Sequence, residues 1–232
     1  MINFHNVDCL EFMKGLPDKA FDLAIVDPPY GIGEDGAKNH SRGKAARPTK
    51  YADKDWDSSI PSAAYFSELR RVSVNQIVWG GNYMTEHLPP RMGWVFWDKH
   101  MGAQDFSDGE LAWTSFDCAL AKFNFAWNGM IQGDMRNKER RIHPTQKPVA
   151  LYRWLLKNYA KPGWKILDTH GGSFSHAIAC DIEGFGLDIC ELDPDYFAAG
   201  KKRFENHLLQ PRMFDAEPTP QPVQLLLDTE EA

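Results

Sequence analysis

The sequence has no apolar run long enough to span a bilayer, and it lacks the basic start and apolar stretch of a secretory signal. Its four cysteines include no C-x-x-C pair, which argues against both a disulfide framework and a structural zinc site. We therefore expect a protein that stays in the cytoplasm, without membrane association and without a bound metal.

Basic residues are missing from the C-terminal end. Residues 215–232 carry acidic side chains and neither lysine nor arginine; the acids are Asp215, Glu217, Asp228, Glu230 and Glu231. Because the whole chain has a net charge of -6, removing these five acids leaves -1 for the rest. We expect residues 1–210 to form one domain and residues 211–232 to be a flexible acidic tail.

Two stretches between the apolar segments are basic and are predicted to be loops. The loop 31–57 has no acid from 38 to 50, where it carries Lys38, Arg42, Lys44, Arg47 and Lys50. The loop 128–142 carries Arg136, Arg140 and Arg141. Solvated surface is the alternative interpretation, but the acid-poor composition favours contact with the phosphates of double-stranded DNA.

Short apolar runs alternate with amphipathic segments, which predicts an α/β domain with a mostly parallel sheet. Helices are expected at 7–15, 62–72, 149–159, 177–182 and 194–207, and strands from Ile2 and at 22–26, 76–80, 94–97, 165–167 and 185–192. Residues 111–127 alternate in polarity and predict an antiparallel hairpin near the sheet edge. Ligands of such sheets bind at the carboxyl ends of the strands, where the turns after Val26 and Leu167 should lie.

The first of these turns, Asp27-Pro28-Pro29-Tyr30, follows a strand that is apolar enough to be buried on both faces. Two prolines end the strand and make the turn rigid. A carboxylate and a backbone carbonyl held in this way can accept both N–H groups of an aromatic amine and stabilise the positive charge that develops as its nitrogen attacks a methyl group. Tyr30 offers a face for an unstacked base. The alternative is an ordinary strand-ending turn.

The second turn, residues 168–173, lies between a strand and a helix, which is the geometry for close approach to a nucleoside. Asp168 would meet an ammonium group, and Gly171 and Gly172 leave room. About 20 residues further on, Glu191 is placed to accept both ribose hydroxyls. Before this turn, Thr145 and Lys147 precede a helix and can face an anion.

These segments resemble the beta class of amino-group DNA methyltransferases. Residues 8–30 are similar to the family's opening and its D-P-P-Y motif, and 143–148 to its H-P-T-x-K-P motif. Residues 168–176 stand in the place of its D-P-F-x-G-S-G-T-T turn, and 191–196 resemble E-L-D-P-x-Y. Thr169, His170 and Phe174 depart from the family's Pro, Phe and last Gly.

The resemblance implies a Rossmann-like methyltransferase fold with a seven-stranded sheet, one strand antiparallel, and a bacterial or phage-infected cell as its place. It implies transfer of a methyl group from S-adenosylmethionine to adenine N6 of a flipped base, with Asp27, Pro28, Pro29 and Tyr30 as catalytic residues. The implied cofactor contacts are Asp8, Cys9, Asp27, His143, Thr145, Lys147, Asp168, His170, Gly171, Gly172, Ser173, Glu191 and Leu192. For Asp8, helix capping is the alternative.

Other functions stay open. An x-P-P-Y turn also serves cytosine N4 or a side-chain amide, and the altered second turn would suit a nucleic-acid-binding module with a degenerate cofactor site. Little more than residues 128–142 stands where relatives usually insert a recognition region. Sequence readout is therefore expected to be short, to come from the 31–57 loop, or to come from a second subunit, which would make the protein a homodimer.

Overall fold

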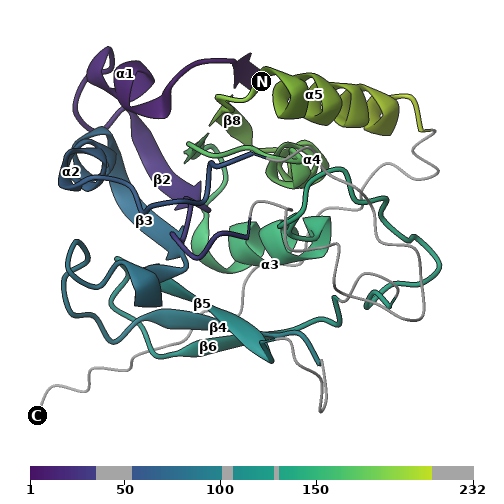
Figure 1. Ribbon diagram of the computed structural model, residues 1–232, viewed down its shortest axis with the longest axis horizontal. Helices are drawn as coiled ribbons and strands as arrows, with labels where there is room; N and C mark the ends of the chain where they lie inside the picture. The colour runs from purple at the N-terminus through teal and green to yellow at the C-terminus, as the bar shows by residue number, and fades with distance from the viewer. Residues whose placement is uncertain (35–53, 101–106, 128–130, 211–232) are drawn as a thin grey trace, which may run out of the picture.

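A computed structural model describes residues 1–34, 54–100, 107–127 and 131–210. The predicted DNA contacts Lys38, Arg42, Lys44, Arg47 and Lys50 lie outside these residues, as does the predicted tail 211–232. The described chain folds around one sheet with helices on both of its faces (Figure 1). Its helices include none that is both long enough and apolar enough to cross a membrane.

The sheet has eight strands in the order β1-β8-β7-β2-β3-β5-β4-β6. The strands are β1 (Ile2–His5), β2 (Phe21–Val26), β3 (Ser73–Trp79), β4 (Trp94–Asp98), β5 (Gly109–Thr114), β6 (Ala121–Asn124), β7 (Lys165–Asp168) and β8 (Gly186–Cys190). Only β5 runs against its neighbours β3 and β4, whereas every other pairing is parallel. One antiparallel strand is thus confirmed, but the expected seven strands are eight.

The predicted hairpin over residues 111–127 is wrong. β5 pairs antiparallel with the preceding strand β4, and β6 lies on the other side of β4 and parallel to it. Alternating polarity fixes which face of a strand is buried, but it does not say which strand lies beside it. The helices match their predictions more closely, since the segments expected at 62–72, 149–159 and 194–207 are helical to within one residue.

The helices form two layers, each over its own apolar core. They are α1 (Cys9–Lys14), α2 (Ala63–Val72), α3 (Val149–Tyr159), α4 (Ser175–Glu183) and α5 (Pro194–Leu208), with a short 3-10 helix η2 (Gly81–Tyr83). One core holds residues of α3, α4 and α5, and the other holds residues of α1 and α2. Successive residues of β2 point to opposite cores, Leu23 and Ile25 to the first and Ala24 and Val26 to the second.

Neighbouring parallel strands bring the two special turns together. β7 lies between β2 and β8, with Ala24 beside Leu167 and Asp168 beside Ile189. The residues that follow β2, β7 and β8 therefore share the carboxyl edge of the sheet. This is the edge at which the sequence predicted both turns.

Candidate active site

The turn after β2 is held by a carboxylate from a distant part of the chain. Asp57 is 2% exposed, and its Oδ1 accepts hydrogen bonds from the backbone N–H groups of Tyr30 at 2.7 Å and Gly31 at 2.9 Å. Its Oδ2 accepts from Glu34 N at 2.7 Å. The last residue of the predicted 31–57 loop is thus buried and supports the turn after β2.

A buried ammonium lies against the turn after β2. The Nζ of Lys147, whose side chain is 3% exposed, is 2.6 Å from Asp27 Oδ1 and 3.0 Å from Glu110 Oε2. It also donates to the hydroxyl of Tyr30 at 3.0 Å. That hydroxyl is 2.8 Å from Asp27 Oδ1 and 3.2 Å from Glu110 Oε2. Lys99, which follows β4, pairs with the other oxygen of Glu110.

This network changes the acidity of its members. Burial raises the pKa of the Asp27 carboxyl, an effect that Lys147 opposes and Glu110 increases. Burial also acts to raise the pKa of Glu110, but Lys147 and Lys99 together hold it well below its usual range. Burial lowers the pKa of Lys147, and the two carboxylates more than offset this, so the ammonium stays charged.

Lys147 is engaged differently from the expectation that it faces a cofactor carboxylate. Asp27 and Tyr30 accept two of the three N–H groups of this ammonium, and Glu110 forms an ion pair with it at 3.0 Å. In this structure Lys147 therefore binds the side chains of the turn after β2.

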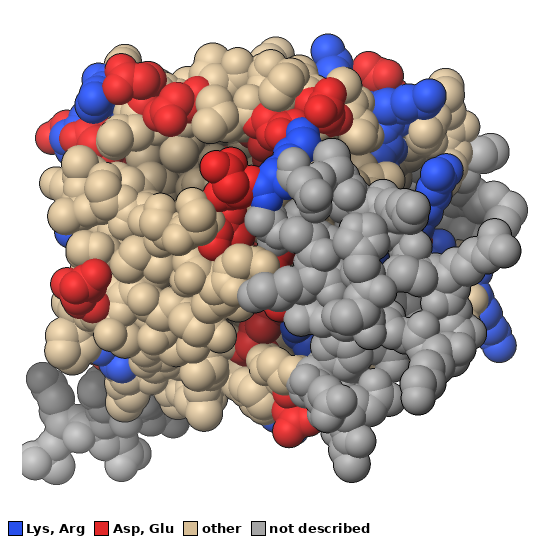
Figure 2. All heavy atoms as spheres, in the orientation of Figure 1, with Lys and Arg blue, Asp and Glu red and all other residues tan. Residues whose placement is uncertain are grey.

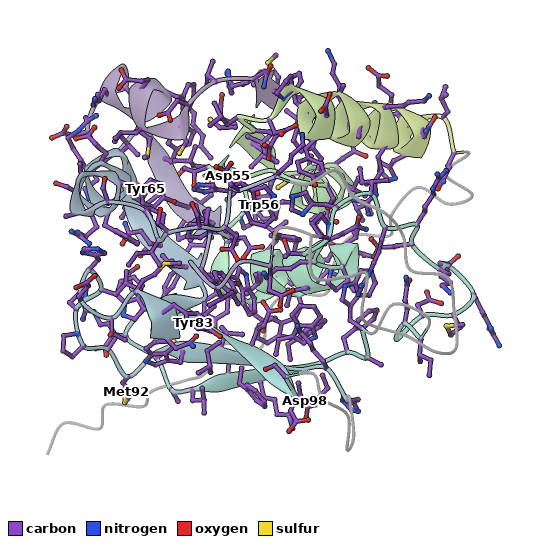
Figure 3. The ribbon with its side chains drawn as sticks, viewed as in Figure 1. Asp55, Trp56, Tyr65, Tyr83, Met92 and Asp98 are labelled. Atoms are coloured by element: carbon purple, nitrogen blue, oxygen red, sulfur yellow. The ribbon has the colours of Figure 1, made fainter. Side chains whose placement is uncertain are left out.

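The aromatic surface beside the turn comes from two tyrosines. Tyr30 stacks on Tyr83 of η2, with ring centroids 5.3 Å apart and planes 18° apart. A Cβ on Gly80, which has a φ of +67°, would lie 2.2 Å from the Tyr30 ring, so glycine is needed there. Tyr83 is 46% exposed and is labelled beside η2 in Figure 3. Tyr83 thus carries the more open ring of the pair, which the sequence analysis did not anticipate.

The turn after β7 is held mainly by its own backbone and its neighbours. Asp168 is 1% exposed; its Oδ1 accepts from His170 N at 3.0 Å, and its Oδ2 lies 3.0 Å from His176 Nδ1. Thr169 Oγ1 lies 2.7 Å from the Tyr65 hydroxyl and 2.8 Å from His170 Nδ1. The carboxylate of Asp168 therefore orders the turn from inside.

Glu191 ties this turn to the end of β8. Its Oε2 accepts from Gly172 N at 2.7 Å, and its Oε1 accepts from Asp193 N at 2.8 Å. Gly171 N donates to Cys190 O at 2.7 Å. Burial raises the pKa of the Glu191 carboxyl, although these backbone donors oppose the rise. The glycine turn and this carboxylate thus lie within one hydrogen bond of each other.

Phe174 adopts a backbone conformation that is typical of glycine, the residue that the family motif has at this position. Its φ of 57° and ψ of 28° lie in the left-handed region, where a glycine is expected. The side chain is fully buried and stacks on Phe4 at 5.1 Å. A Cβ on Gly171 or Gly200 would come within 2.5 or 2.8 Å of the Phe174 ring, so these glycines make room for it. The substitution fills the core beneath the turn.

His143 lies in an aromatic cluster beside the glycine turn. Its ring is 4.3 Å from that of Tyr196 and 5.2 Å from that of Trp56, and Thr145 Oγ1 lies 3.2 Å from its Nδ1. Burial lowers the pKa of His143 to about 3, so the ring is neutral. A Cβ on Gly172 would lie 3.7 Å from this ring. Figure 3 labels Trp56 over the middle of the face.

The remaining predicted contacts are placed as follows. Asp8 is the N-cap of α1 and accepts from Leu10 N at 2.8 Å and Glu11 N at 3.0 Å, so the capping alternative holds for its Oδ1. Cys9 is half-buried, and burial raises the pKa of its thiol to about 12. Ser173 is buried with its hydroxyl near that of Ser175, and Leu192 is 65% exposed.

Within the described part of the second basic loop, Arg136 and Arg140 are exposed. Arg141 instead lies over the Trp127 ring, 5.0 Å from its centroid. On the face drawn in Figure 2, acidic groups gather near the middle, and several basic groups lie at the right-hand margin.

Four residues of the site were not found by sequence reasoning: Asp57, Tyr83, Lys99 and Glu110. Asp57, Tyr83 and Glu110 lie far along the chain from the motif residues that they contact, and Lys99 contacts Glu110. A single usable signal is present for Tyr83, because Gly80-Gly81 directly after a strand indicates close backbone approach.

A family model described as DNA methylase (N6_N4_Mtase) matches residues 96–202. The Type II methyltransferase M.HinfI of Haemophilus influenzae is 22% identical to the chain, over 94% of this chain and 70% of the relative. The putative methylase YubD of Escherichia coli K12 is 28% identical, over 88% of this chain and 90% of the relative.

Solved structures share the fold. The M1.HpyAVI–SAM complex matches with a TM-score of 0.53 at 18% identity, covering 88% of this chain and all of that one. The PvuII DNA methyltransferase, named as cytosine-N4-specific, matches with a TM-score of 0.56 at 13% identity, covering 88% and 86%. The family model and the curated relatives show that the chain is similar to amino-group DNA methyltransferases.

Proposed function

We propose that the protein transfers a methyl group from S-adenosylmethionine to the N6 amino group of an adenine in double-stranded DNA. The observation that carries this proposal is the shared edge: Asp27 follows β2, and Gly172 and Glu191 follow the adjacent β7 and β8. A site for an amine and a site for a nucleoside therefore meet at the ends of neighbouring strands.

The residues after β7 and β8 fit a cofactor that carries a nucleoside. Gly172 has a positive φ and bare backbone, the Glu191 carboxylate can accept ribose hydroxyls, and the neutral His143 ring offers an apolar wall. When bound, the cofactor supplies a methyl group on a sulfonium. Because Phe174 keeps the left-handed backbone and points into the core, the altered turn does not argue for a degenerate site.

The catalytic turn would act on the target amine through hydrogen bonding. Asp27 accepts one N–H of the amino group, and the carbonyl of Pro28 accepts the other, which favours a tetrahedral nitrogen and stabilises its developing positive charge. Rigid prolines and the Asp57 carboxylate hold these acceptors in place. The ring pair Tyr30–Tyr83 offers the aromatic surface for a flipped base.

Adenine is proposed as the target because D-P-P-Y is the form of the turn that the resemblance associates with it. The exposed Arg136 and Arg140 are proposed to contact DNA phosphates, together with the five basic residues of the 38–50 stretch.

The test is to incubate the protein with cofactor labelled on the methyl group and long unmethylated DNA, and then to separate the nucleosides. N6-methyladenine is expected, and Asp27→Ala should lower the yield at least about 10³-fold while cofactor binding, measured by calorimetry, changes little. Asp22→Ala is the matched control, since this carboxylate accepts from Lys165 N at the far end of β2. Labelled N4-methylcytosine would replace the adenine assignment, and cofactor binding without any labelled base would indicate a binding module.

A further inference from the structure

The buried ammonium of Lys147 pairs with two carboxylates, those of Asp27 and Glu110, and only Asp27 belongs to the D-P-P-Y motif. Removing an ammonium from water is costly unless it is paired and its N–H groups are satisfied. Lys147 meets this condition through hydrogen bonds to Asp27 and Tyr30 and an ion pair with Glu110. Glu110, on β5, therefore completes the site that holds the lysine.

The contacts on Asp27 fall on one side of its carboxylate. Both hydrogen bonds that it accepts from described residues, from Lys147 at 2.6 Å and Tyr30 at 2.8 Å, go to Oδ1. A carboxylate fixed through one oxygen presents the other in a defined direction. Oδ2 is thus the oxygen suited to the N–H of a bound amine.

The charges in this network alternate. Lys99 pairs with Glu110, Glu110 with Lys147, and Lys147 with Asp27. If Lys147 faced Asp27 alone, its charge would cancel that of the acceptor. Because Glu110 shares the ammonium, Asp27 keeps more of its negative charge, which is what an amine that becomes positive during attack requires.

We propose that Glu110 is a positioning residue for methyl transfer: it holds the Lys147 ammonium on Oδ1 of Asp27 and leaves Oδ2 charged and free to accept the target N–H. This rests on the proposed function, because the target amine is the group that Oδ2 would meet. Glu110 does not itself touch the reacting atoms, and it acts through Lys147.

Opposite pH effects distinguish this role from a structural one. Transfer requires ionised Asp27, so the rate falls as the pH drops through its pKa. Glu110 raises the pKa of Asp27 and Lys147 lowers it. The other titratable groups nearby are Tyr30, which donates to Asp27, and Lys99, which pairs with Glu110. Tyr152 of α3 is also close enough for the charge of Asp27 to raise its own pKa. Glu110→Gln should therefore move the acid limb of the rate profile to lower pH, and Lys147→Gln should move it to higher pH.

The experiment measures single-turnover methyl transfer against pH with cofactor and DNA bound beforehand. Glu110→Gln should lower the plateau rate about tenfold, with cofactor and DNA dissociation constants within about threefold of wild type. Glu110→Asp should recover part of the rate. Glu68→Gln is the control, since Glu68 is as exposed as Glu110 (21% against 22%) and pairs with Arg71 on α2. A Glu110→Gln profile like that of wild type, or an acid limb that moves upward, would overturn the proposal.

A readout independent of activity separates this inference from the proposed function. Titration of the Asp27 carboxyl carbon by NMR in ¹³C-labelled full-length protein should show its pKa lowered by Glu110→Gln and raised by Lys147→Gln. If wild type methylates no base, the proposed function fails, and the titration still tests the network. Equal Asp27 pKa values in wild type and both variants would overturn it.

Discussion

The two turns at the carboxyl edge are stabilised differently. The turn after β2 has the residues of the D-P-P-Y motif, and side chains from elsewhere in the chain hold it: Asp57 on its backbone and Lys147 on its carboxylate. The turn after β7 departs from the family motif; its own Asp168 holds it from within, over a buried Phe174, and Glu191 from the end of β8 binds its backbone.

The comparison shows that a sequence motif can indicate either which side chains are needed or which backbone conformation is needed. At the β2 turn, the identity of the residues matters because their atoms would meet the amine. At the β7 turn, the path of the backbone matters, and residues that keep this path can replace one another. Substitutions should therefore affect chemistry at the first turn and stability or cofactor affinity at the second.

The largest effect is expected at Phe174. Phe174→Ala should lower the free energy of unfolding by about 3–5 kcal/mol, because a buried ring is lost. Phe174→Gly should be no worse than Phe174→Ala, since glycine relieves about 1 kcal/mol of left-handed strain at this φ of 57°. At Leu155, buried within α3, glycine should instead be worse than alanine. Denaturant unfolding measures the free energy of unfolding of all four variants. If glycine costs as much relative to alanine at position 174 as it does at position 155, the proposed left-handed strain at Phe174 is contradicted.

A smaller effect is expected at Asp57, which tests the external support of the first turn. Asp57→Ala leaves three backbone N–H groups without their acceptor and should cost about 2–4 kcal/mol of stability. The single-turnover rate should fall as well, with cofactor affinity unchanged, because only the β2 turn loses support. Asp57→Asn, which keeps an acceptor oxygen, should lie between. A loss of cofactor affinity equal to the loss of rate would show that the two turns are not independent.

The smallest effect is expected at Glu191. Glu191→Gln should weaken cofactor binding about tenfold, equivalent to about 1.4 kcal/mol, because a charged acceptor for ribose hydroxyls becomes neutral. The methyl-transfer rate at saturating cofactor should change little. Asp195→Asn serves as the control, since this side chain is 83% exposed and pairs only with Lys54 in the salt bridges of the described chain. Calorimetry measures both, and equal affinities in the two variants would remove Glu191 from the cofactor site.

Sequence reasoning reached the fold through patterns that are local. The apolar run of β2, the period of α3 and the prolines after Val26 each predict structure without knowledge of distant residues. The partner of β6 could not be predicted in this way, because alternation does not choose between β4 and β5. For the same reason Glu110 and Asp57 were missed: their role depends on contacts that only the folded chain creates.

The Phe174 ring has a consequence for how this chain can vary. Gly171 and Gly200 belong to different elements, yet any added side chain at either would collide with the same ring. A lineage that restored glycine at position 174 would leave a space that larger residues at 171 or 200 could fill. We therefore expect these three positions to change together across homologues, as a linked set, while the neighbouring Gly172 stays constant.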